Sequence, residues 1–274
     1  MAGPIVKYVG GKTRLLPELR KRMPGVYRRY YEPFMGGAAL FFDLAPPEAI
    51  LGDMNRDLVE MYIAVAARPE AVSEHLLQHR DAYHAQGSTY YLAVRDLWNG
   101  QAWKLQTAER AAAFIFMTKT CFNGLWRVNK SGRMNTPPGK YAAPKIFDEV
   151  ELRAASMLLR TALIRYGDYK DTTATAAAGD FAYFDSPYDP ISKTASFTSY
   201  TKDAFGDEQQ AQLAAHAGVL RDRGVFVMLS NSDTPMIRDF YQKFRIETVR
   251  CGRSINSKAG LRGAVNEVLI TGVL

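Results

Sequence analysis

The chain has 274 residues and a formal net charge of +7, with 47% hydrophobic and 23% charged residues, a composition typical of globular proteins. It lacks an apolar stretch of the roughly 18 residues that span a membrane, an apolar secretory signal, and enough cysteines for a disulfide framework or a cysteine-rich zinc site. We therefore expect a cytoplasmic protein of one large domain, or a core domain with an insert, whose positive charge suits a polyanionic partner.

The first region of the chain alternates strands and helices around a glycine turn. Its pattern predicts a helix over 13–23 and a short buried strand over 30–33. The turn Met35-Gly36-Gly37 leads into a predicted helix over 38–44 and a second strand over 49–53. A strand, a glycine turn, a helix and another strand form the unit that is typical of parallel nucleotide-binding sheets.

The second region has no comparable strands and is dominated by helical periodicity. Its predicted helices span residues 57–67, 69–85, 90–99 and 107–118. Thr107 is suited to cap the last of them. After it, residues 120–133 interleave aromatic and cationic side chains, and residues 135–141 form a loop. We therefore expect a group of helices followed by a basic, aromatic loop.

The third region returns to alternating strands and helices. It contains predicted strands over 181–185 and 225–229 and, between them, a helix over 207–223 that begins with Asp207 as N-cap. Segments 246–250 and 267–273 fit a closing antiparallel pair. The whole pattern predicts an α/β fold, a Rossmann-like sheet with an antiparallel final strand that is interrupted by the helices of the second region.

The tetrapeptide DSPY at residues 185–188 follows a buried strand, where open α/β sheets place their ligand sites. Pro187 stiffens this turn, and the ring of Tyr188 offers a flat face for a flipped-out base. The Asp185 carboxylate and a backbone carbonyl of the turn can accept both N–H groups of an exocyclic amine, which directs the nitrogen lone pair outward for attack on a methyl group. Read alone, the tetrapeptide fits an ordinary strand-ending turn better than a catalytic motif.

A second candidate site is the glycine turn together with the acid that ends the next strand. Gly36 and Gly37 let the backbone approach a ligand closely, and Asp53 is suited to bind ribose hydroxyls. The G-x-G-x-x-G pattern of dinucleotide sites is absent, but a methyl donor without phosphates tolerates a looser turn. A turn without a ligand fits these residues equally well.

Two further segments point to nucleic acid without excluding a structural role. Residues 122–133 offer arginine, asparagine and aromatic side chains that read bases or wedge between them, or else form a helix end with a basic hairpin. Residues 250–258 and Arg262 form a basic loop that suits phosphate contacts and a solvated surface equally.

Three other patterns favour structural roles. GGK at residues 10–12 lacks the spacing of a phosphate-binding loop, so a basic loop is expected there. His75 and His79 have a metal-binding spacing, but without an HExxH motif they favour a solvated helix face. The threonine- and alanine-rich residues 172–178 fit an exposed loop or a fraying helix.

Taken together, the motifs resemble the Dam-type (D12 class) family of DNA adenine-N6 methyltransferases over nearly the whole chain. KYVGGK at 7–12 is similar to the family's N-terminal methyl-donor motif, and YEPFMGGA at 31–38 is similar to its glycine motif. TCFNGLWRVN at 120–129 resembles its DNA-recognition signature, a highly specific match. DSPY resembles its catalytic motif, usually DPPY, and RSIN at 253–256 and VNEVLI at 265–270 resemble its C-terminal blocks.

The resemblance implies roles for individual residues. Catalytic positions are occupied by Asp185, Ser186, Pro187 and Tyr188. Positions that contact S-adenosylmethionine, or that lie in the glycine motif beside it, are occupied by Tyr8, Lys12, Phe34, Gly36, Asp53 and Asp185. DNA-contacting positions are occupied by Lys7 at a guanine, Phe122 as an aromatic that enters the base stack, and Asn123, Arg127, Pro137 and Tyr141.

The chain departs from the family pattern at two places. Ser186 stands where the catalytic motif has its first proline, which loosens the turn and adds a hydroxyl but keeps the backbone carbonyl. Activity is therefore expected to survive. Ala38 and Ala39 stand where many members have a third glycine, and a small residue still fits there.

These observations predict a catalytic methyltransferase domain of residues 1–55 and 145–274 and a helical target-recognition domain of residues 56–144. The enzyme is expected to transfer a methyl group from S-adenosylmethionine, with S-adenosylhomocysteine as product, to N6 of an adenine flipped out of double-stranded DNA. GATC is the leading candidate for the recognised site. Because the sulfonium methyl is already activated, neither a metal nor a covalent enzyme intermediate is expected.

We expect no membrane and no obligate protein partner, and a DNA-associated protein of the cytoplasm that is of prokaryotic or phage origin. A restriction system, a phage and a host regulatory programme fit the sequence equally. Three alternatives stay open: methylation of cytosine N4, whose amine needs the same acceptors, methylation of RNA or of a protein amide, and a DNA-binding protein without catalysis, which only Ser186 favours.

Overall fold

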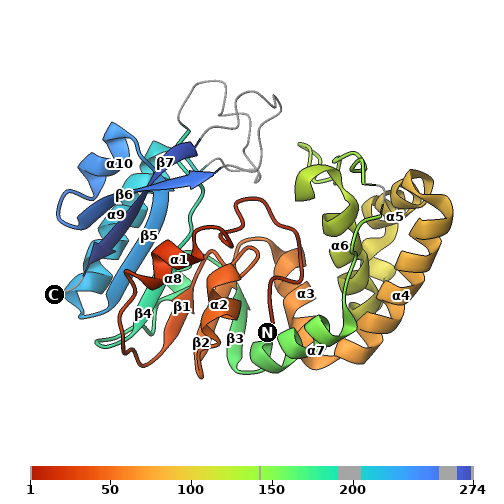
Figure 1. Ribbon diagram of the computed structural model, residues 1–274, viewed down its shortest axis with the longest axis horizontal. Coiled ribbons are helices and arrows are strands. Elements are labelled where there is room, and N and C mark those ends of the chain that lie inside the picture. Colours follow the sequence, from red (N-terminus) through yellow and green to blue (C-terminus); the bar gives the residue numbers. More distant parts are fainter. Residues whose placement is uncertain (1, 142, 191–204, 253–263, 273–274) are drawn as a thin grey trace. The chain divides into compact units, whose positions relative to one another are not determined.

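The computed structural model describes residues 2–141, 143–190, 205–252 and 264–272 (Figure 1). Its strands are β1 (Tyr30–Glu32), β2 (Ala49–Asp53), β3 (Ala162–Tyr166), β4 (Phe181–Phe184), β5 (Phe226–Ser232), β6 (Arg245–Gly252) and β7 (Ala264–Gly272). They form one sheet in the order β3-β2-β1-β4-β5-β7-β6.

The longer helices are α3 (Arg56–Ala67), α4 (Pro69–Gln86), α5 (Ser88–Gln101), α6 (Thr107–Thr120), α7 (Glu149–Leu159) and α9 (Asp207–Asp222). The shorter ones are α1 (Leu16–Arg20), α2 (Ala39–Leu44), α8 (Tyr169–Thr172) and α10 (Pro235–Phe240), with 3-10 turns η1 (Ala102–Lys104) and η2 (Phe122–Gly124). Within the described residues, no helix has both the length and the apolar character that crossing a membrane requires.

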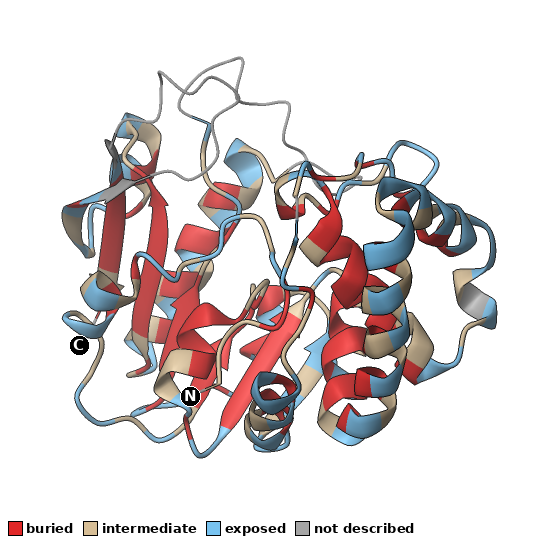
Figure 2. Cartoon of the chain, turned by 45° about the vertical axis from the view of Figure 1, so that its right-hand side comes forward, coloured by how far each residue is buried: buried red, intermediate tan, exposed pale blue. Residues whose placement is uncertain are grey.

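The sheet is parallel through its centre and antiparallel at one end. Strand β1 runs parallel to β2 and β4, with Tyr30 beside Ala49 and Phe181. Strand β5 continues the parallel part, and β7 runs antiparallel to both β5 and β6. Every residue of β1 and β4 is buried, as expected of central strands that are covered on both faces (Figure 2). The predicted α/β sheet with an antiparallel final strand is confirmed.

One face of the sheet packs on helices from the third region of the chain. Leu213, Ala217 and Leu220 of α9 recur at helical spacing and are completely buried. They join Leu229 of β5 and Ile270 of β7 in one hydrophobic cluster. This packing fixes α9 on the strands that carry the candidate catalytic turn.

The four helices predicted for the second region are confirmed as α3, α4, α5 and α6. Helix α6 is buried on most of its surface, and its Phe114 packs against Trp98 of α5 and against Trp126. The expectation of a solvated face at His75 and His79 is wrong for His79. Its imidazole stacks on Phe116 at 4.9 Å, and burial lowers its pKa to about 4, so that the ring stays neutral.

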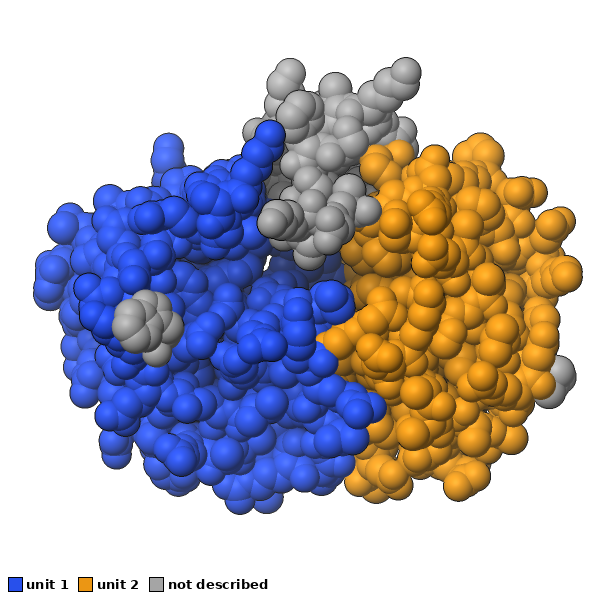
Figure 3. Space-filling view, turned by 180° about the vertical axis from the view of Figure 1, so that it is seen from behind, with its two compact units in different colours: residues 1–11, 36–45, 53–166 blue, residues 12–35, 46–52, 167–274 orange. Residues whose placement is uncertain are grey.

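Contacts within the chain group into two compact units, coloured separately in Figure 3. One unit contains residues 1–11, 36–45 and 53–166, and the other contains residues 12–35, 46–52 and 167–274. Helices α3 to α7 belong to the first unit. The boundaries proposed above for a catalytic and a recognition domain stay a prediction.

Several local expectations need correction. Helix α1 begins only at Leu16, because Pro17 fits without strain only in the first turn of a helix. The N-cap of α6 is Gln106, not Thr107, and the N-cap of α9 is Gly206, not Asp207. In each case the helix boundary lies one residue earlier, since the competing residue itself adopts helical geometry.

The prediction that the threonine- and alanine-rich residues 172–178 are exposed is confirmed for Ala174, Thr175, Ala177 and Ala178 and is wrong for the first two threonines. Thr172 and Thr173 are completely buried. Their hydroxyls donate to the carbonyls of Asp168 and Tyr169, four residues earlier, at 3.0 and 2.8 Å. Bonding of this kind hides the polar atoms of threonine, so its methyl group can pack inside the protein.

Candidate functional site

The first cluster of predicted site residues surrounds Asp185, which directly follows β4. The Lys12 ammonium lies 2.7 Å from Asp185 Oδ1, and the Ser230 hydroxyl donates to the same oxygen at 3.0 Å. Burial raises the pKa of Asp185, while Lys12 and Ser230 oppose that shift by stabilising the carboxylate. One carboxylate oxygen therefore carries both stabilising contacts.

A hydroxyl chain supports the carboxylate from the neighbouring strand. The Tyr183 hydroxyl lies 2.9 Å from the Ser230 hydroxyl. Because Ser230 gives its proton to Asp185, it accepts from Tyr183. Burial raises the pKa of Tyr183 well above its usual value of 10, which keeps it a neutral donor. Tyr183 lies on β4 and Ser230 lies on β5. Because these strands are paired, their backbone hydrogen bonds hold the two hydroxyls in register.

Tyr188 is held through both its ring and its hydroxyl. The Lys12 ammonium lies 4.6 Å from the centre of the Tyr188 ring, within the range of a cation–π contact. The Tyr188 hydroxyl donates to Glu267 of β7 at 3.1 Å. Burial raises the pKa of this hydroxyl far above 10, so it remains a donor at neutral pH. Lys12 thus connects the acid and the aromatic ring of the turn.

The middle of the turn is anchored through its backbone. The Pro187 carbonyl accepts a hydrogen bond of 2.8 Å from the side chain of Gln210 in α9. Ser186 is buried, and within the described residues its hydroxyl has no hydrogen-bond partner. Relative to a proline at this position, the serine therefore adds a hydroxyl without adding a hydrogen bond to another described residue.

Phe34 contributes packing beside the same cluster. Its ring stacks on Tyr169 at 5.6 Å and meets the edge of Phe205 at 5.9 Å. It also lies 6.5 Å from Phe184, the residue that precedes Asp185. The structure therefore places Phe34 in an aromatic group at the end of β4.

The second cluster, in the other unit, surrounds the glycine turn. Each oxygen of Asp53 accepts one backbone N–H, from Gly36 at 3.0 Å and from Asn55 at 2.8 Å. Burial raises the pKa of Asp53 to about 6 in spite of these bonds. Asp53 thus shapes the turn itself, and its carboxylate retains acceptor capacity for a ligand hydroxyl.

Tyr8 lies directly against this turn. Asn55 donates to its hydroxyl at 3.0 Å, and Tyr62 donates to the Gly36 carbonyl at 3.1 Å. Gly36 has a φ of +44°, and a Cβ there would lie 3.4 Å from the Tyr8 ring. Only glycine fits this conformation without strain. Tyr8, Gly36 and Asp53 therefore form a compact cradle with an aromatic wall and a carboxylate.

A third cluster unites predicted DNA-contacting residues of the first unit. Lys7 Nζ donates to the Tyr141 hydroxyl at 2.8 Å, and that hydroxyl donates to the Cys121 carbonyl at 3.3 Å. Gly124 has a φ of +69°, and a Cβ there would come within 2.7 Å of Lys7. Lys7 and Tyr141 are 134 residues apart in the sequence. Both nevertheless contact the turn that begins the predicted recognition signature.

The remaining predicted DNA contacts lie on the loop after α6, where Phe122, Arg127 and Pro137 are exposed and Asn123 is partly buried. The Phe122 side chain is 43% exposed, while its backbone N–H is held by the Pro137 carbonyl at 2.9 Å. Asn123 adopts a left-handed φ of 55°, which asparagine tolerates better than most residues. Arg127 is exposed, and its Nε donates to Asn135 at 2.8 Å. A fixed backbone therefore presents accessible side chains.

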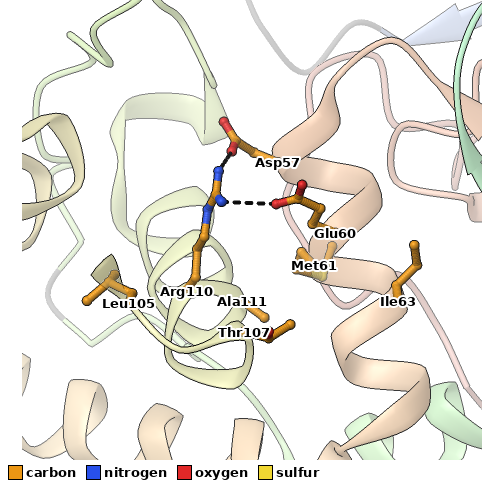
Figure 4. Close-up of a pocket in the computed structure, with 8 residues that line it drawn as sticks. All are labelled: Asp57, Glu60, Met61, Ile63, Leu105, Thr107, Arg110 and Ala111. Carbon is orange, nitrogen blue, oxygen red and sulfur yellow. Dashed lines mark hydrogen bonds and ion pairs between the residues drawn. The ribbon is translucent and has the colours of Figure 1, made fainter. Parts of the chain in front are cut away.

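A separate hollow of about 330 Å³ lies between α3 and α6 (Figure 4). Arg110 joins Asp57 at 2.5 Å and Glu60 at 3.0 Å across it. No residue predicted for catalysis or DNA contact lines the hollow. The two ion pairs of Arg110 connect α3 and α6 across it.

Sequence reasoning missed four polar residues that touch the Asp185 turn: Ser230, Asn231, Gln210 and Glu267. Polar side chains at the end of a buried strand, as in Ser230-Asn231-Ser232, are a usable signal, because buried polar groups need partners. Of the predicted basic loop at residues 250–258 and Arg262, residues 250–252 belong to strand β6, which corrects the prediction there, and the rest lies outside the described residues.

Comparison with known proteins relates the chain to one family. A profile of the D12 class N6 adenine-specific DNA methyltransferases matches residues 8–255. The chain is 39% identical to Type II methyltransferase M1.LlaDCHI of Lactococcus lactis subsp. cremoris, over 98% of this chain and 94% of that protein. It is 39% identical to Type II methyltransferase M.MjaIII of Methanocaldococcus jannaschii, over 97% and 98%. It is 33% identical to the DNA adenine methylase of Escherichia coli K12, over 96% and 93%.

Proposed function

Since the chain belongs to the D12 class of N6 adenine-specific DNA methyltransferases, we propose that it transfers the methyl group of S-adenosylmethionine to N6 of an adenine flipped out of double-stranded DNA. The observation that carries this proposal is the arrangement of Lys12, Ser230 and Tyr188 around Asp185. It supplies an ionised acceptor beside an aromatic face at the end of a buried strand.

The contacts of the turn indicate which oxygens accept the amine. Lys12 and Ser230 both bind Oδ1 of Asp185, so we assign Oδ2 to the first N–H of the adenine amino group. Gln210 binds the Pro187 carbonyl, so we assign the Ser186 carbonyl to the second N–H. Two oriented acceptors direct the nitrogen lone pair away from the ring and stabilise the positive charge that develops on N6.

Tyr188 is the proposed stacking partner of the flipped adenine. A flat ring held at both ends loses little conformational freedom when a base stacks on it. S-adenosylmethionine, when bound, supplies a methyl group that its sulfonium already activates. The residues of the chain then have to align the amine with that methyl, exclude water and accept the charge that appears on N6.

The cradle of Tyr8, Gly36 and Asp53 is the proposed donor site. Phe34, Lys12 and Asp185 are the other proposed cofactor-binding residues. The aromatic wall suits the adenine ring of the donor, and the remaining acceptor capacity of Asp53 suits its ribose hydroxyls. The left-handed φ of +44° at Gly36, which favours glycine, fits a backbone that lies directly against a ligand.

Residues 56–144 are the proposed target-recognition domain. Lys7 and Tyr141 are proposed to touch DNA together, with Phe122 entering the base stack and Asn123, Arg127 and Pro137 beside it. The net charge of +7 supports binding to a polyanion. GATC is the proposed recognition site, and the cytoplasm is the proposed location. We propose that the reaction needs no metal and no obligate protein partner.

The test is methylation of duplex DNA by the purified protein with isotopically labelled S-adenosylmethionine, followed by digestion and analysis of the labelled nucleoside. We expect N6-methyladenine, and sequencing of the methylated DNA gives the recognised site. Label on cytosine N4, or only on RNA or protein, would contradict the proposed substrate. Methylation of adenines outside GATC would contradict the proposed site alone.

A further inference from the structure

Two buried amide side chains bracket Tyr188, and we propose that they are positioning residues for methyl transfer. They are Gln210 of α9 and Asn231 of β5, which hold the backbone on either side of Tyr188. This inference rests on the proposed function and adds to it the residues that keep the stacking ring and the neighbouring acceptors in place.

Gln210 holds the residue before Tyr188. It is 1% exposed and lies in the first part of α9, where the hydrophobic residues of that helix pack on the sheet. Its Nε2 donates to the Pro187 carbonyl at 2.8 Å. The packed helix therefore fixes the carbonyl that precedes Tyr188.

Asn231 holds the residue after Tyr188. It is 2% exposed and lies near the end of β5, within the paired part of the sheet. Its Oδ1 accepts the backbone N–H of Asp189 at 2.9 Å. The same oxygen accepts the N–H of Ser232 at 2.8 Å, which fixes the side chain against its own strand.

The two amide side chains are hydrogen-bonded to each other, and the backbone groups of Pro187 and Asp189 fix their orientation. Asn231 Nδ2 donates to Gln210 Oε1 at 3.2 Å. The Pro187 carbonyl can only accept, so Gln210 must turn its NH₂ group toward it. The Asp189 N–H can only donate, so Asn231 must turn its oxygen toward it. Each amide has one arrangement that satisfies all of these bonds, and reversing either one breaks them.

The other contacts of Tyr188 complete its support. Glu267 accepts from its hydroxyl at 3.1 Å, and Lys12 lies 4.6 Å above its ring. The backbone is thus fixed on both sides of the residue, and the ring is fixed at its tip and over its face. Support of this kind lowers the conformational freedom that a base must remove when it stacks.

The same bonds act on the proposed acceptors. Ser186 lies between Asp185, which Ser230 holds, and Pro187, which Gln210 holds. Its carbonyl direction therefore depends on both anchors. A donor–acceptor misplacement of about 1 Å can lower a rate by about 100-fold, so small movements of this turn should be visible in kcat.

The test compares Gln210→Met, Gln210→Glu and Asn231→Asp with the wild type in single-turnover and steady-state methylation of adenine in duplex DNA. Gln210→Met keeps the side-chain volume and removes the donor to Pro187. We expect kcat to fall by about 10- to 100-fold, with KM for DNA and for S-adenosylmethionine within about twofold. Asn231→Asp should behave alike, because a carboxylate cannot donate to Gln210.

The pH profile separates positioning from general stability. In Gln210→Glu the introduced carboxyl cannot donate to Pro187 when it is ionised, but it can donate when protonated. We therefore expect the rate of this variant, relative to wild type, to rise as the pH is lowered toward about 5, since burial raises the pKa of a carboxyl. A variant that is merely less stable would not recover at lower pH.

A base analogue reports on the ring directly. 2-Aminopurine at the target position is quenched when it stacks, so its fluorescence in the complex with Gln210→Met should exceed that with the wild type. Gln212→Met, on an exposed position of the same helix, is the matched control for substitution in α9. Leu220→Ala, in the core of the same unit, is the control for lost stability, because it lowers thermal stability without contacting the turn.

Unchanged kcat and fluorescence in the folded variants, with adenine still methylated by the wild type, would overturn the inference but not the proposed function. A wild-type protein that does not methylate adenine would overturn both. If the variants fail to fold, hydrogen exchange of the wild type decides. The Asp189 amide should exchange slowly, and rapid exchange would show that Asn231 does not hold it.

Discussion

The turn at residues 185–189 and the loop at residues 121–141 both carry predicted functional residues, but they are supported in opposite ways. In the turn, buried polar groups such as Ser230, Gln210 and Asn231 fix individual atoms of the chemistry. In the loop, hydrogen bonds fix the backbone and leave Phe122 and Arg127 exposed.

The difference follows from what each region is proposed to do. Methyl transfer requires donor, amine and acceptors to be aligned before the reaction, so the protein has to hold those groups in the absence of DNA. Base recognition requires side chains that reach into a groove and adjust to it. Substitutions in the turn should therefore affect kcat, and substitutions in the loop should affect DNA recognition.

The largest effect is expected for the acid of the turn. Asp185→Ala removes the proposed acceptor of the amine, so methyl transfer should fall by about 100- to 1000-fold while DNA binding remains measurable. Labelled methyl incorporation and a DNA-binding titration measure the two quantities. Asp189→Ala is the matched control, because Asp189 bonds to Asn231 through its backbone N–H, which the substitution keeps. Near-normal turnover in Asp185→Ala would refute its role.

Phe122→Ala should give the next largest effect. Loss of the wedge makes the adenine harder to extrude, and we expect kcat/KM on duplex DNA to fall by about 10- to 100-fold. A mismatch opposite the target adenine lowers the cost of extrusion and should restore much of the rate. Leu92→Ala, also an exposed apolar residue, should change neither value. Equal losses on paired and mismatched DNA would argue against a wedge.

Arg127→Ala is expected to reduce discrimination between sequences more than overall affinity. A bidentate base contact contributes about 1–3 kcal/mol to discrimination. The measurement is the ratio of kcat/KM on the recognised site and on sites with one altered base pair. Lys130→Ala, exposed on the same loop, serves as the comparison. If Arg127→Ala weakens binding to all sequences alike, Arg127 contacts phosphate and not a base.

The smallest effect concerns pH and the donor cradle. The pKa of Asp53 is raised to about 6, so the carboxylate is charged at pH 7 and becomes protonated as the pH falls through 6. Protonation removes acceptor capacity for ribose hydroxyls, so the affinity for S-adenosylmethionine should fall by up to about tenfold between pH 7 and pH 5. Calorimetric titration of wild type and Asp53→Asn tests this, and an identical pH dependence in both would assign the titration to another group.

Much of the fold could be predicted, because it depends on patterns within short segments. The periodicity of apolar residues located α3, α4, α5 and α6 and the strands that end at Asp53 and Phe184. Helix α7 was missed although Asp148 and Glu149 provide a capping signal. Helix α10 spans only six residues, too few for periodicity to be visible, and β3 is largely exposed, so its apolar pattern is weak.

The candidate site was predictable only in part. Motifs located Asp185, Tyr188, Gly36 and Asp53, because the chemistry of these residues is visible in short stretches of sequence. Their partners were not visible, because a buried hydrogen bond depends on which strand and helix pack beside the motif. Gln210 lies 23 residues from Pro187, and Ser230 lies 45 residues from Asp185, with no local pattern to connect them.

The sequence by itself determined most of the strands and helices, the excess of positive charge and the residues that can accept, stack and approach a ligand, since these are properties of single residues and short segments. Tertiary structure alone decided that Lys12 and Ser230 share one oxygen of Asp185 and that two amides enclose Tyr188. Buried polar groups must find partners as the chain packs, and that packing selects which distant groups meet.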